Sequence, residues 1–276
     1  MRRKSRRTRK GRLHPSRFWP SARLRRRGLR AFRRAPVAVQ VAIVLAIAVV
    51  LWGALNGIYQ VIRKPTELFF PVSGTLAKTP SETWREYAPI FRKHSTSVMT
   101  PDLLAALAQV EASGNPVART YWRWSWKLQP FEVYRPASSA VGMYQITDGA
   151  FENASRYCIH DHVVVEDGPW HAWRSCWFNS LYFRVIPSHA VELTSASLDR
   201  GVKRALARKG IKSATLGQKQ KLAMLIHLCG AGAGDAYARR GFQLSRGQRC
   251  GDHDVRAYLG RVASMRRVFT RLAGQG

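Results

Sequence analysis

The chain has 276 residues, with 46 Lys and Arg against 16 Asp and Glu, and a net charge of +30. This length suffices for one catalytic domain of ordinary size plus shorter segments. The charge excess predicts an anionic partner. It also argues against a compact fold for the first 34 residues, which are dense in Arg and Lys and contain no acidic residue. We therefore predict that residues 1–35 form a disordered basic tail.

The next segment, residues 36–62, is predominantly apolar and carries no charge. About 20 apolar residues span a bilayer, so a helix of this length crosses one with some tilt. A cleavable signal peptide has a shorter apolar region of roughly 7–15 residues. Trp52 and Tyr59 lie near the far end, as interface aromatics do. We predict an uncleaved transmembrane helix with the basic tail in the cytoplasm, so that the tail is a topology signal and nucleic acid is the less favoured partner.

The cysteines lie beyond this segment. An even number of cysteines in an exported domain predicts disulfides, and three pairings are possible. We favour the local pairing, first with second and third with fourth, because each bond closes a short loop. Zinc is the competing interpretation, since histidines lie nearby, but no C-x-x-C spacing supports it. The residues concerned are Cys158, Cys176, Cys229 and Cys250.

The remaining elements are predicted from apolar spacing and from helix start and stop signals. Residues 63–80 mix Pro, Gly, Ser and Thr and are predicted to be a linker. Ser81 is the predicted cap of the first helix after it, and Thr100 that of the second. The fold class is all-α with a small hairpin or loop insertion. The predicted helices cover about 81–94, 101–112, a short one from 147–148, 187–208, 216–229 and 254–272, with a hairpin or ordered loop at 121–136 and irregular structure at 156–186.

Glu111 stands out among the acidic residues. Leu103, Leu107 and Glu111 are spaced four residues apart, so they share one face of the predicted helix. Burial among leucines raises the pKa of a carboxyl group, and a position in the last helical turn acts in the same direction. A carboxylic acid that stays protonated near neutral pH is what a general acid needs. The spacing therefore predicts a general acid, against the alternative of a surface glutamate at a frayed helix end.

Two sequence blocks extend this interpretation. Residues 111–116 are EASGNP, and residues 138–147 are SSAVGMYQIT. Together they resemble the soluble lytic transglycosylase (SLT) family, which has Glu-Ser, a short turn ending in Pro, and then Ser-x-x-Gly-Ala-x-Gly-Leu-Met-Gln. Residues 226–232 (IHLCGAG) resemble a diverged form of the family's Ala-Tyr-Asn-x-Gly segment, and Tyr258 resembles its late tyrosine. The matches occur in the family's order.

The chain also departs from the family pattern. Ala112 replaces the serine after the glutamate, and Ser113 is the nearest hydroxyl that could substitute for it. His227 stands where the family has tyrosine, and Leu228 where it has asparagine. The spacing from Glu111 to the glutamine block is longer than in the family. The excess is the aromatic stretch 121–136.

The resemblance implies a lysozyme-like (α+β) catalytic domain over residues 81–276, held at the bacterial inner membrane and facing the periplasm. Its reaction would be non-hydrolytic cleavage of the MurNAc–GlcNAc bond of peptidoglycan, leaving 1,6-anhydro ends. Glu111 would give a proton to the bridging oxygen and then remove one from the sugar's own C6 hydroxyl. The substrate's N-acetyl group would stabilise the cationic centre, and no cofactor or metal would be needed. Substrate contacts would come from Ser113, Ser139, Tyr144, Gln145, His227 and Tyr258.

The aromatic insertion at 121–136 has two possible roles. Aromatic rings pack against the C–H faces of sugars, so Trp122 and Trp124 are candidate walls of a glycan groove. The alternative is a satellite hydrophobic cluster that packs the insertion onto the domain, which we favour slightly for most of the rings.

Two other functions stay open. A hydrolytic muramidase on the same fold would need a second carboxylate, for which Asp148, Glu152 and Glu132 are the nearest candidates in sequence. A non-catalytic scaffold would bind murein and recruit proteins of an envelope machine. The altered segment at His227 is the feature that favours the scaffold.

Overall fold

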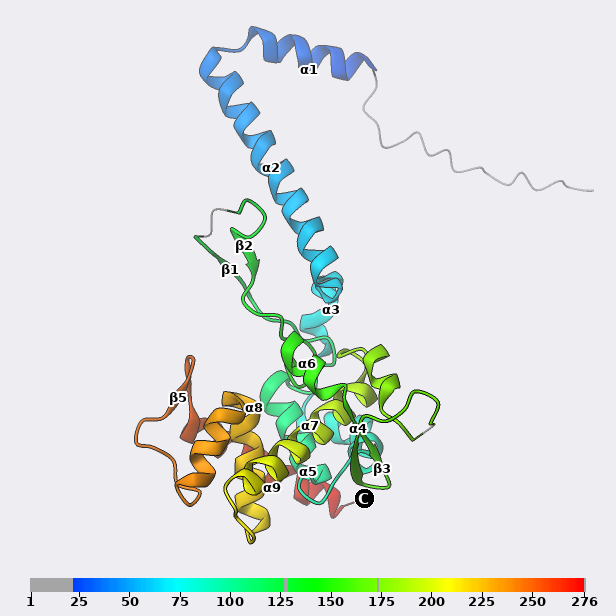
Figure 1. Cartoon of the computed structure of the whole chain (residues 1–276). Helices are drawn as coiled ribbons and strands as arrows, with labels where there is room; N and C mark the ends of the chain where they lie inside the picture. The colour runs from blue at the N-terminus through cyan, green and yellow to red at the C-terminus, as the bar shows by residue number, and fades with distance from the viewer. Residues whose placement is uncertain (1–21, 127–128, 173, 276) are drawn as a thin grey trace, which may run out of the picture. The chain divides into compact units, whose positions relative to one another are not determined.

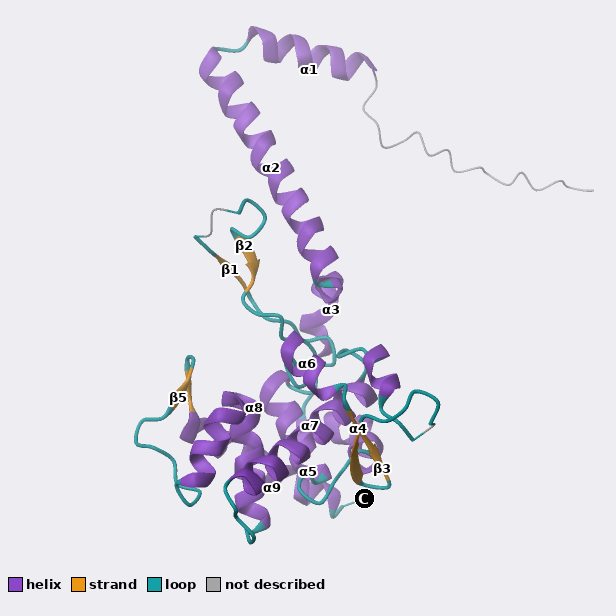
Figure 2. Cartoon of the chain, in the orientation of Figure 1, coloured by secondary structure: helices purple, strands orange, loops and turns teal. Residues whose placement is uncertain are grey.

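A computed structural model describes residues 22–126, 129–172 and 174–275. Over these residues the chain is mostly helical, with small two-stranded antiparallel hairpins, which confirms the predicted predominance of helix (Figures 1 and 2). The chain divides into two compact units, residues 1–57 and residues 58–276.

The first unit contains helix α1, Ala22–Arg34, and most of helix α2, Val37–Arg63. The prediction of disorder is wrong for α1. Arg, Leu and Ala are good helix formers, and the segment is helical despite its strong positive charge. The rest of the predicted tail, residues 1–21, lies outside the described residues. Helix α2 is long and apolar enough to cross a membrane by length and composition.

The second unit begins in the last turns of α2. The segment predicted to be a linker instead forms short helices in succession, and within it Glu67 is buried at 4% exposure. Arg119 and Trp122 both donate to the carboxylate of Glu67, and Lys64 lies 3.2 Å from its other oxygen. The segment is therefore folded against the domain. Its elements are η2, Pro65–Phe69, α3, Phe70–Ser73, and η3, Gly74–Leu76.

The helices of the body lie close to their predicted positions. The first begins one residue earlier than Ser81, because Thr79 is its cap and forms a capping box with Glu82. Thr100 precedes the second helix but does not cap it through its side chain, which accepts from Gln220 instead. The long helices are α4, Pro80–Lys93, α5, Pro101–Ala112, α7, Pro187–Arg208, α8, Leu216–Arg239, and α9, Val255–Ala273.

Helix α8 is longer than predicted. It continues ten residues beyond Cys229, through a break at Gly230, where φ is 80° and ψ is 172°. Gly234 then packs so closely on Ile226 that a Cβ would lie 2.5 Å from its side chain. The two halves of α8 are thus held together by a contact that only glycine permits.

Smaller elements surround these helices. The insertion does form a hairpin, and a second hairpin lies in the region predicted to be irregular, so that prediction is wrong there. These elements are β1, Trp122–Trp124, with β2, Tyr134–Pro136; α6, Asp148–Ala154; β3, Tyr157–His160, with β4, Val163–Glu166; η4, Trp177–Leu181; and β5, Arg249–Cys250, with β6, His253–Asp254.

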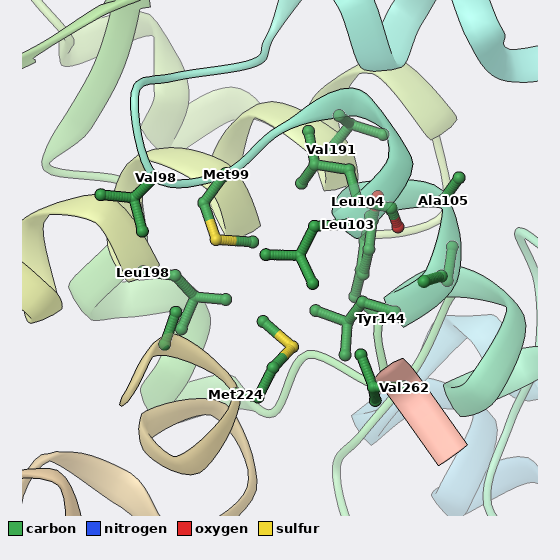
Figure 3. Close-up of a cluster of buried hydrophobic side chains, with 14 of the residues drawn as sticks. Val98, Met99, Leu103, Leu104, Ala105, Tyr144, Val191, Leu198, Met224 and Val262 are labelled. Atoms are coloured by element: carbon green, nitrogen blue, oxygen red, sulfur yellow. Dashed lines mark hydrogen bonds between the residues drawn. The ribbon is translucent and has the colours of Figure 1, made fainter. Parts of the chain in front are cut away.

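The core forms where α5 packs on α4 and α9, and it also takes in buried residues of α7 and α8. Leu103, Leu104 and Leu107 of α5 are at most 2% exposed. Burying such a side chain contributes about 1.5–3 kcal/mol. Helix α5 is therefore a fixed central support, and Glu111 stands in its last turn. Figure 3 shows Leu103 and Leu104 among Val98, Met99, Tyr144, Val191, Leu198, Met224 and Val262.

The local disulfide pairing is confirmed: Cys158 bonds Cys176, and Cys229 bonds Cys250. The second bond ties the β5–β6 hairpin to α8. We expect Cys229→Ser to lower the free energy of unfolding by about 2–4 kcal/mol, because the denatured chain loses a constraint. Denaturant titration without reductant measures this change. Wild-type protein treated with reductant should show at least the same loss, and an unchanged midpoint for the variant would contradict a structural role.

Candidate active site

Glu111 lies on the wall of a cavity of about 580 Å³. The cavity is bounded by the end of α5, by α6 and the loop before it, by α7, by the middle of α8 and by β6. Its volume is within the usual range for ligand sites. The cavity therefore has room for a ligand next to the carboxylate.

The backbone around Glu111 fixes the end of its helix. Ser113 closes α5 in the left-handed region at φ 51°, and Gly114 follows at φ 66°. A Cβ on Gly114 would lie 2.2 Å from the hydroxyl oxygen of Thr83, so the turn is pressed against α4. This ending resembles the left-handed caps by which many helices stop. The tightly packed end of α5 therefore fixes the position of Glu111 in the last helical turn.

Two side chains from distant helices meet the Glu111 carboxylate. The Tyr258 hydroxyl, from α9, donates to Oε1 at 2.5 Å, and Nε2 of His227, from α8, lies 3.4 Å from the same oxygen. Tyr258 is 2% exposed, whereas the side chains of Glu111 and His227 are about one-sixth exposed. Tyr258 therefore orients the Glu111 carboxylate from a buried position, whereas His227 lines the same cavity as Glu111.

The predicted rise in the Glu111 pKa is wrong, because these neighbours lower it. Burial does raise the pKa of this carboxyl, but the hydrogen bond and charge of His227, the Tyr258 hydroxyl and the charge of His253 together bring the pKa below its ordinary value. Burial and the neighbouring carboxylate raise the pKa of Tyr258, so this hydroxyl stays protonated as a donor. In the free protein Glu111 is a carboxylate at neutral pH.

Gln145 reaches the cavity from a strained loop. It has φ 48°, and its side-chain amide donates to the carbonyl oxygen of Gly142 at 2.9 Å. Gly142 has φ 80°, and a Cβ there would lie 2.3 Å from the Arg184 carbonyl oxygen. Residue 142 therefore has no room for a side chain larger than that of glycine. The close packing of this loop holds Gln145 at the cavity wall.

The other residues predicted to bind substrate lie elsewhere. Tyr144 is 0% exposed, its hydroxyl donates to the Leu104 carbonyl oxygen, and it belongs to the core shown in Figure 3. Ser139 accepts from the backbone N–H of Asp148 at the start of α6, and Ser113 serves the helix end. These three predicted contacts are therefore structural in this conformation.

The two tryptophans also lie outside the cavity lining. Trp122 donates its indole N–H to Glu67, and the rings of Trp124 and Tyr134 lie tilted against each other with centroids 4.8 Å apart. The aromatic insertion thus does not line the cavity in which Glu111 lies, and the substrate contacts of both rings stay a prediction.

Residues that the sequence analysis missed contribute positive charge to the cavity. Arg200, Arg204 and Arg208 follow one another at four-residue spacing along α7 and all line it. Arg200 and Arg204 pair with Glu166, and Arg208 pairs with Asp235 at 2.7 Å. The spacing is a signal that the sequence carries, since such residues share one helix face.

The predicted second carboxylates are not part of the cavity. Asp148 has a 72% exposed side chain and pairs with Arg184 at 2.7 Å, and Glu132 pairs with Arg63 at 2.9 Å. Glu152 is exposed on α6. Among the described residues that line the cavity, Glu111 is the sole carboxylate.

Comparison with protein-family models, with curated proteins and with solved structures finds no match to this chain.

The His227 contact has a measurable consequence for pH dependence. Because the hydrogen bond and charge of His227 lower the Glu111 pKa, His227→Leu should raise that pKa. A general acid works only in its protonated form, so activity falls as pH rises through its pKa. If Glu111 acts as a general acid on a glycan substrate, the falling limb of kcat/KM should therefore move to higher pH in the variant. His253 and Tyr258 remain next to Glu111 in both proteins, and an unmoved limb would contradict the assignment.

Proposed function

We propose that the chain is a membrane-anchored murein lytic transglycosylase with Glu111 as its acid and base. The observation that carries this proposal is a single cavity carboxylate, held by Tyr258 and His227, with no second carboxylate among the described lining residues. Proton donation and return by one group is the chemistry that such a site supports.

The proposed reaction begins with a glycan strand covering the cavity. Excluding water from Glu111 raises its pKa and favours the protonated form. Glu111 then gives its proton to the glycosidic oxygen, and the bond from that oxygen to the muramic acid C1 breaks. The N-acetyl carbonyl of the same sugar stabilises C1. The Glu111 carboxylate next removes the proton of the C6 hydroxyl, whose oxygen bonds to C1 and closes the 1,6-anhydro ring.

The remaining neighbours fit this cycle. Tyr258 fixes one oxygen of the carboxylate, Gln145 presents an amide at the wall, and His227 replaces the usual tyrosine as a contact to Glu111. The arginines of α7 leave the cavity wall basic, since Arg156, Arg200 and Arg204 all approach the one carboxylate of Glu166. Murein stems carry carboxylates, which such a wall attracts.

The proposed setting is the bacterial inner membrane, with α1 in the cytoplasm and residues after α2 in the periplasm on a lysozyme-like fold. The apolar helix α2 and the basic residues on its N-terminal side support this orientation. The two disulfides support an extracytoplasmic second unit, since such bonds persist in oxidising compartments.

The second candidate is a murein-binding scaffold for an envelope machine. The lowered pKa of Glu111 favours it, because a carboxylate that is ionised at rest is a poorer acid. Incubating the full-length protein in detergent with insoluble murein separates the two functions. The proposal expects release of soluble muropeptides over time. Binding to the sediment with no release over the pH range tested would favour the scaffold.

A further inference from the structure

The proposed reaction does not use the β1–β2 segment. Its described residues, 121–126 and 129–136, are here called the aromatic hairpin. Figure 1 shows it projecting from the helical body of the second unit. Tyr121 is 69% exposed, Trp124 65% and Trp126 100%. Large exposed aromatic side chains grouped on one projection indicate an interaction surface.

The base of the aromatic hairpin is fixed at the segment that follows α2. Trp122 donates its indole N–H to Glu67 at 2.8 Å, and Lys64 donates to the carbonyl oxygens of Ser138 and Ala140 at 3.2 and 3.1 Å. Because Glu67 is buried, the Trp122–Glu67 hydrogen bond is shielded from water and stabilises the base of the hairpin.

Nearer its turn, the aromatic hairpin contacts the last turns of α2 itself. Arg63 pairs with Glu132 at 2.9 Å. Gln60 donates to the Phe131 carbonyl oxygen at 2.6 Å, and the rings of Tyr59 and Phe131 lie 5.3 Å apart. Glu67 contacts the base of the hairpin, whereas the earlier residues Arg63, Gln60 and Tyr59 contact residues closer to the hairpin turn. The hairpin therefore extends back along the end of α2.

The length of α2 indicates where these contacts lie in a bilayer. Its 27 residues span about 40 Å at 1.5 Å per residue. The hydrocarbon core is about 30 Å thick, so the helix is longer than the core by about two turns. The last turns, residues 58–63, are the ones that hold the hairpin and carry the polar side chains Gln60 and Arg63. They belong at the level of the lipid headgroups, where Trp and Tyr are enriched and where an Arg side chain near a helix end reaches the interface.

We propose that the aromatic hairpin is a second membrane contact that lies in the headgroup region of the periplasmic leaflet. It rests on the proposed membrane anchor. Trp124 and Trp126 enter the boundary between headgroups and acyl chains, and Arg123 meets lipid phosphates. The short helices after α2 extend this surface, since Leu68 is 67% exposed and Val72 46%. The contact would hold the second unit close to the membrane, so that it acts on the nearest murein strands.

The test uses nitroxide labels on the full-length protein in vesicles of phosphatidylethanolamine and phosphatidylglycerol. Trp126→Cys places a label on the hairpin, Val44→Cys one in α2, and Leu216→Cys one at an exposed apolar position of α8. The native cysteines are paired in disulfides and leave the new thiol for labelling. Collision with oxygen against collision with an aqueous nickel chelate reports depth.

The expected result is a label at residue 126 that is shielded from the chelate at headgroup depth, with residue 44 deep in the core and residue 216 in water. A deep residue 44 with residue 126 as accessible as residue 216 would overturn the hairpin contact alone. Residue 44 in water would overturn the anchor and the hairpin contact together. Immobilisation of a water-exposed residue 126 label by added glycan strands would assign the hairpin to substrate instead. Muropeptide release in detergent is measured separately, so failure of the enzymatic proposal is distinguished from each of these outcomes.

Discussion

Glu111→Gln is expected to lower the rate of muropeptide release by about 10²–10⁴-fold, the usual contribution of a general acid–base group. The amide keeps the shape of the side chain and still accepts the hydrogen bond from Tyr258, but it cannot give and retake a proton. The fold should survive, because Glu111 is on the cavity wall and not in the core. The measurement is the initial rate of release from murein, with circular dichroism to verify the fold.

Asp148→Asn and Glu152→Gln are the matched controls for this variant. Both carboxylates are close in sequence to the Gln145 block, and neither lines the cavity. Each variant should keep most of the wild-type rate. Either one as inactive as Glu111→Gln would mean that a second carboxylate takes part and that the single-group mechanism is wrong.

The second large effect is expected at Glu67. Glu67→Ala leaves Lys64 and Arg119 facing one another without their shared carboxylate, and removes the acceptor of the Trp122 indole. Breaking a buried ion pair from one side typically costs about 3–5 kcal/mol. Local opening of the β1–β2 hairpin should then increase by about two to four orders of magnitude. Hydrogen exchange of the backbone amides of residues 122–124 in the full-length protein measures this opening.

Glu86→Gln provides the comparison for a surface ion pair. Its carboxylate lies 3.5 Å from Lys78 and is about half exposed, and such pairs contribute about 0–1 kcal/mol. Hydrogen exchange in the hairpin should not change in this variant. Unchanged exchange in Glu67→Ala as well would show that the cluster does not hold the base of the hairpin.

The long helices were predictable because their signals are local. Apolar spacing together with helix start and stop signals predicts all five. For α4 the true cap, Thr79, with Pro80 as the first helical residue, lies two residues before the predicted cap, Ser81. The hairpin at 157–166 was missed because its turn, Asp161-His162, lacks the glycine that usually marks two positive φ angles (here 50° and 64°). The continuation of α8 past Gly230 depends on packing between its two halves, which no local pattern encodes.

The site was predictable only in part, for a related reason. The position of Glu111 on an apolar helix face is a local property, whereas its pKa depends on His227 and Tyr258, which lie 116 and 147 residues further along the chain. Burial alone predicts a raised pKa for Glu111. The spacing of apolar residues in α5 does not reveal that Tyr258 and His227 contact the carboxylate. The sequence predicts Tyr144 and Gln145 together at the site, whereas Met143 and Tyr144 lie in the core and Gln145 lines the cavity. Only the folded loop shows which side each one faces.

The structure of the released glycan ends tests the central claim most directly. Full-length protein is incubated with purified murein in water enriched in heavy oxygen, and the products are analysed by mass spectrometry. If Glu111 acts alone, the attacking oxygen comes from the sugar. The products then carry 1,6-anhydromuramic ends that are lighter by one water than reducing ends and contain no label. Reducing muramic acid ends that carry the heavy oxygen would contradict the account and identify a hydrolase.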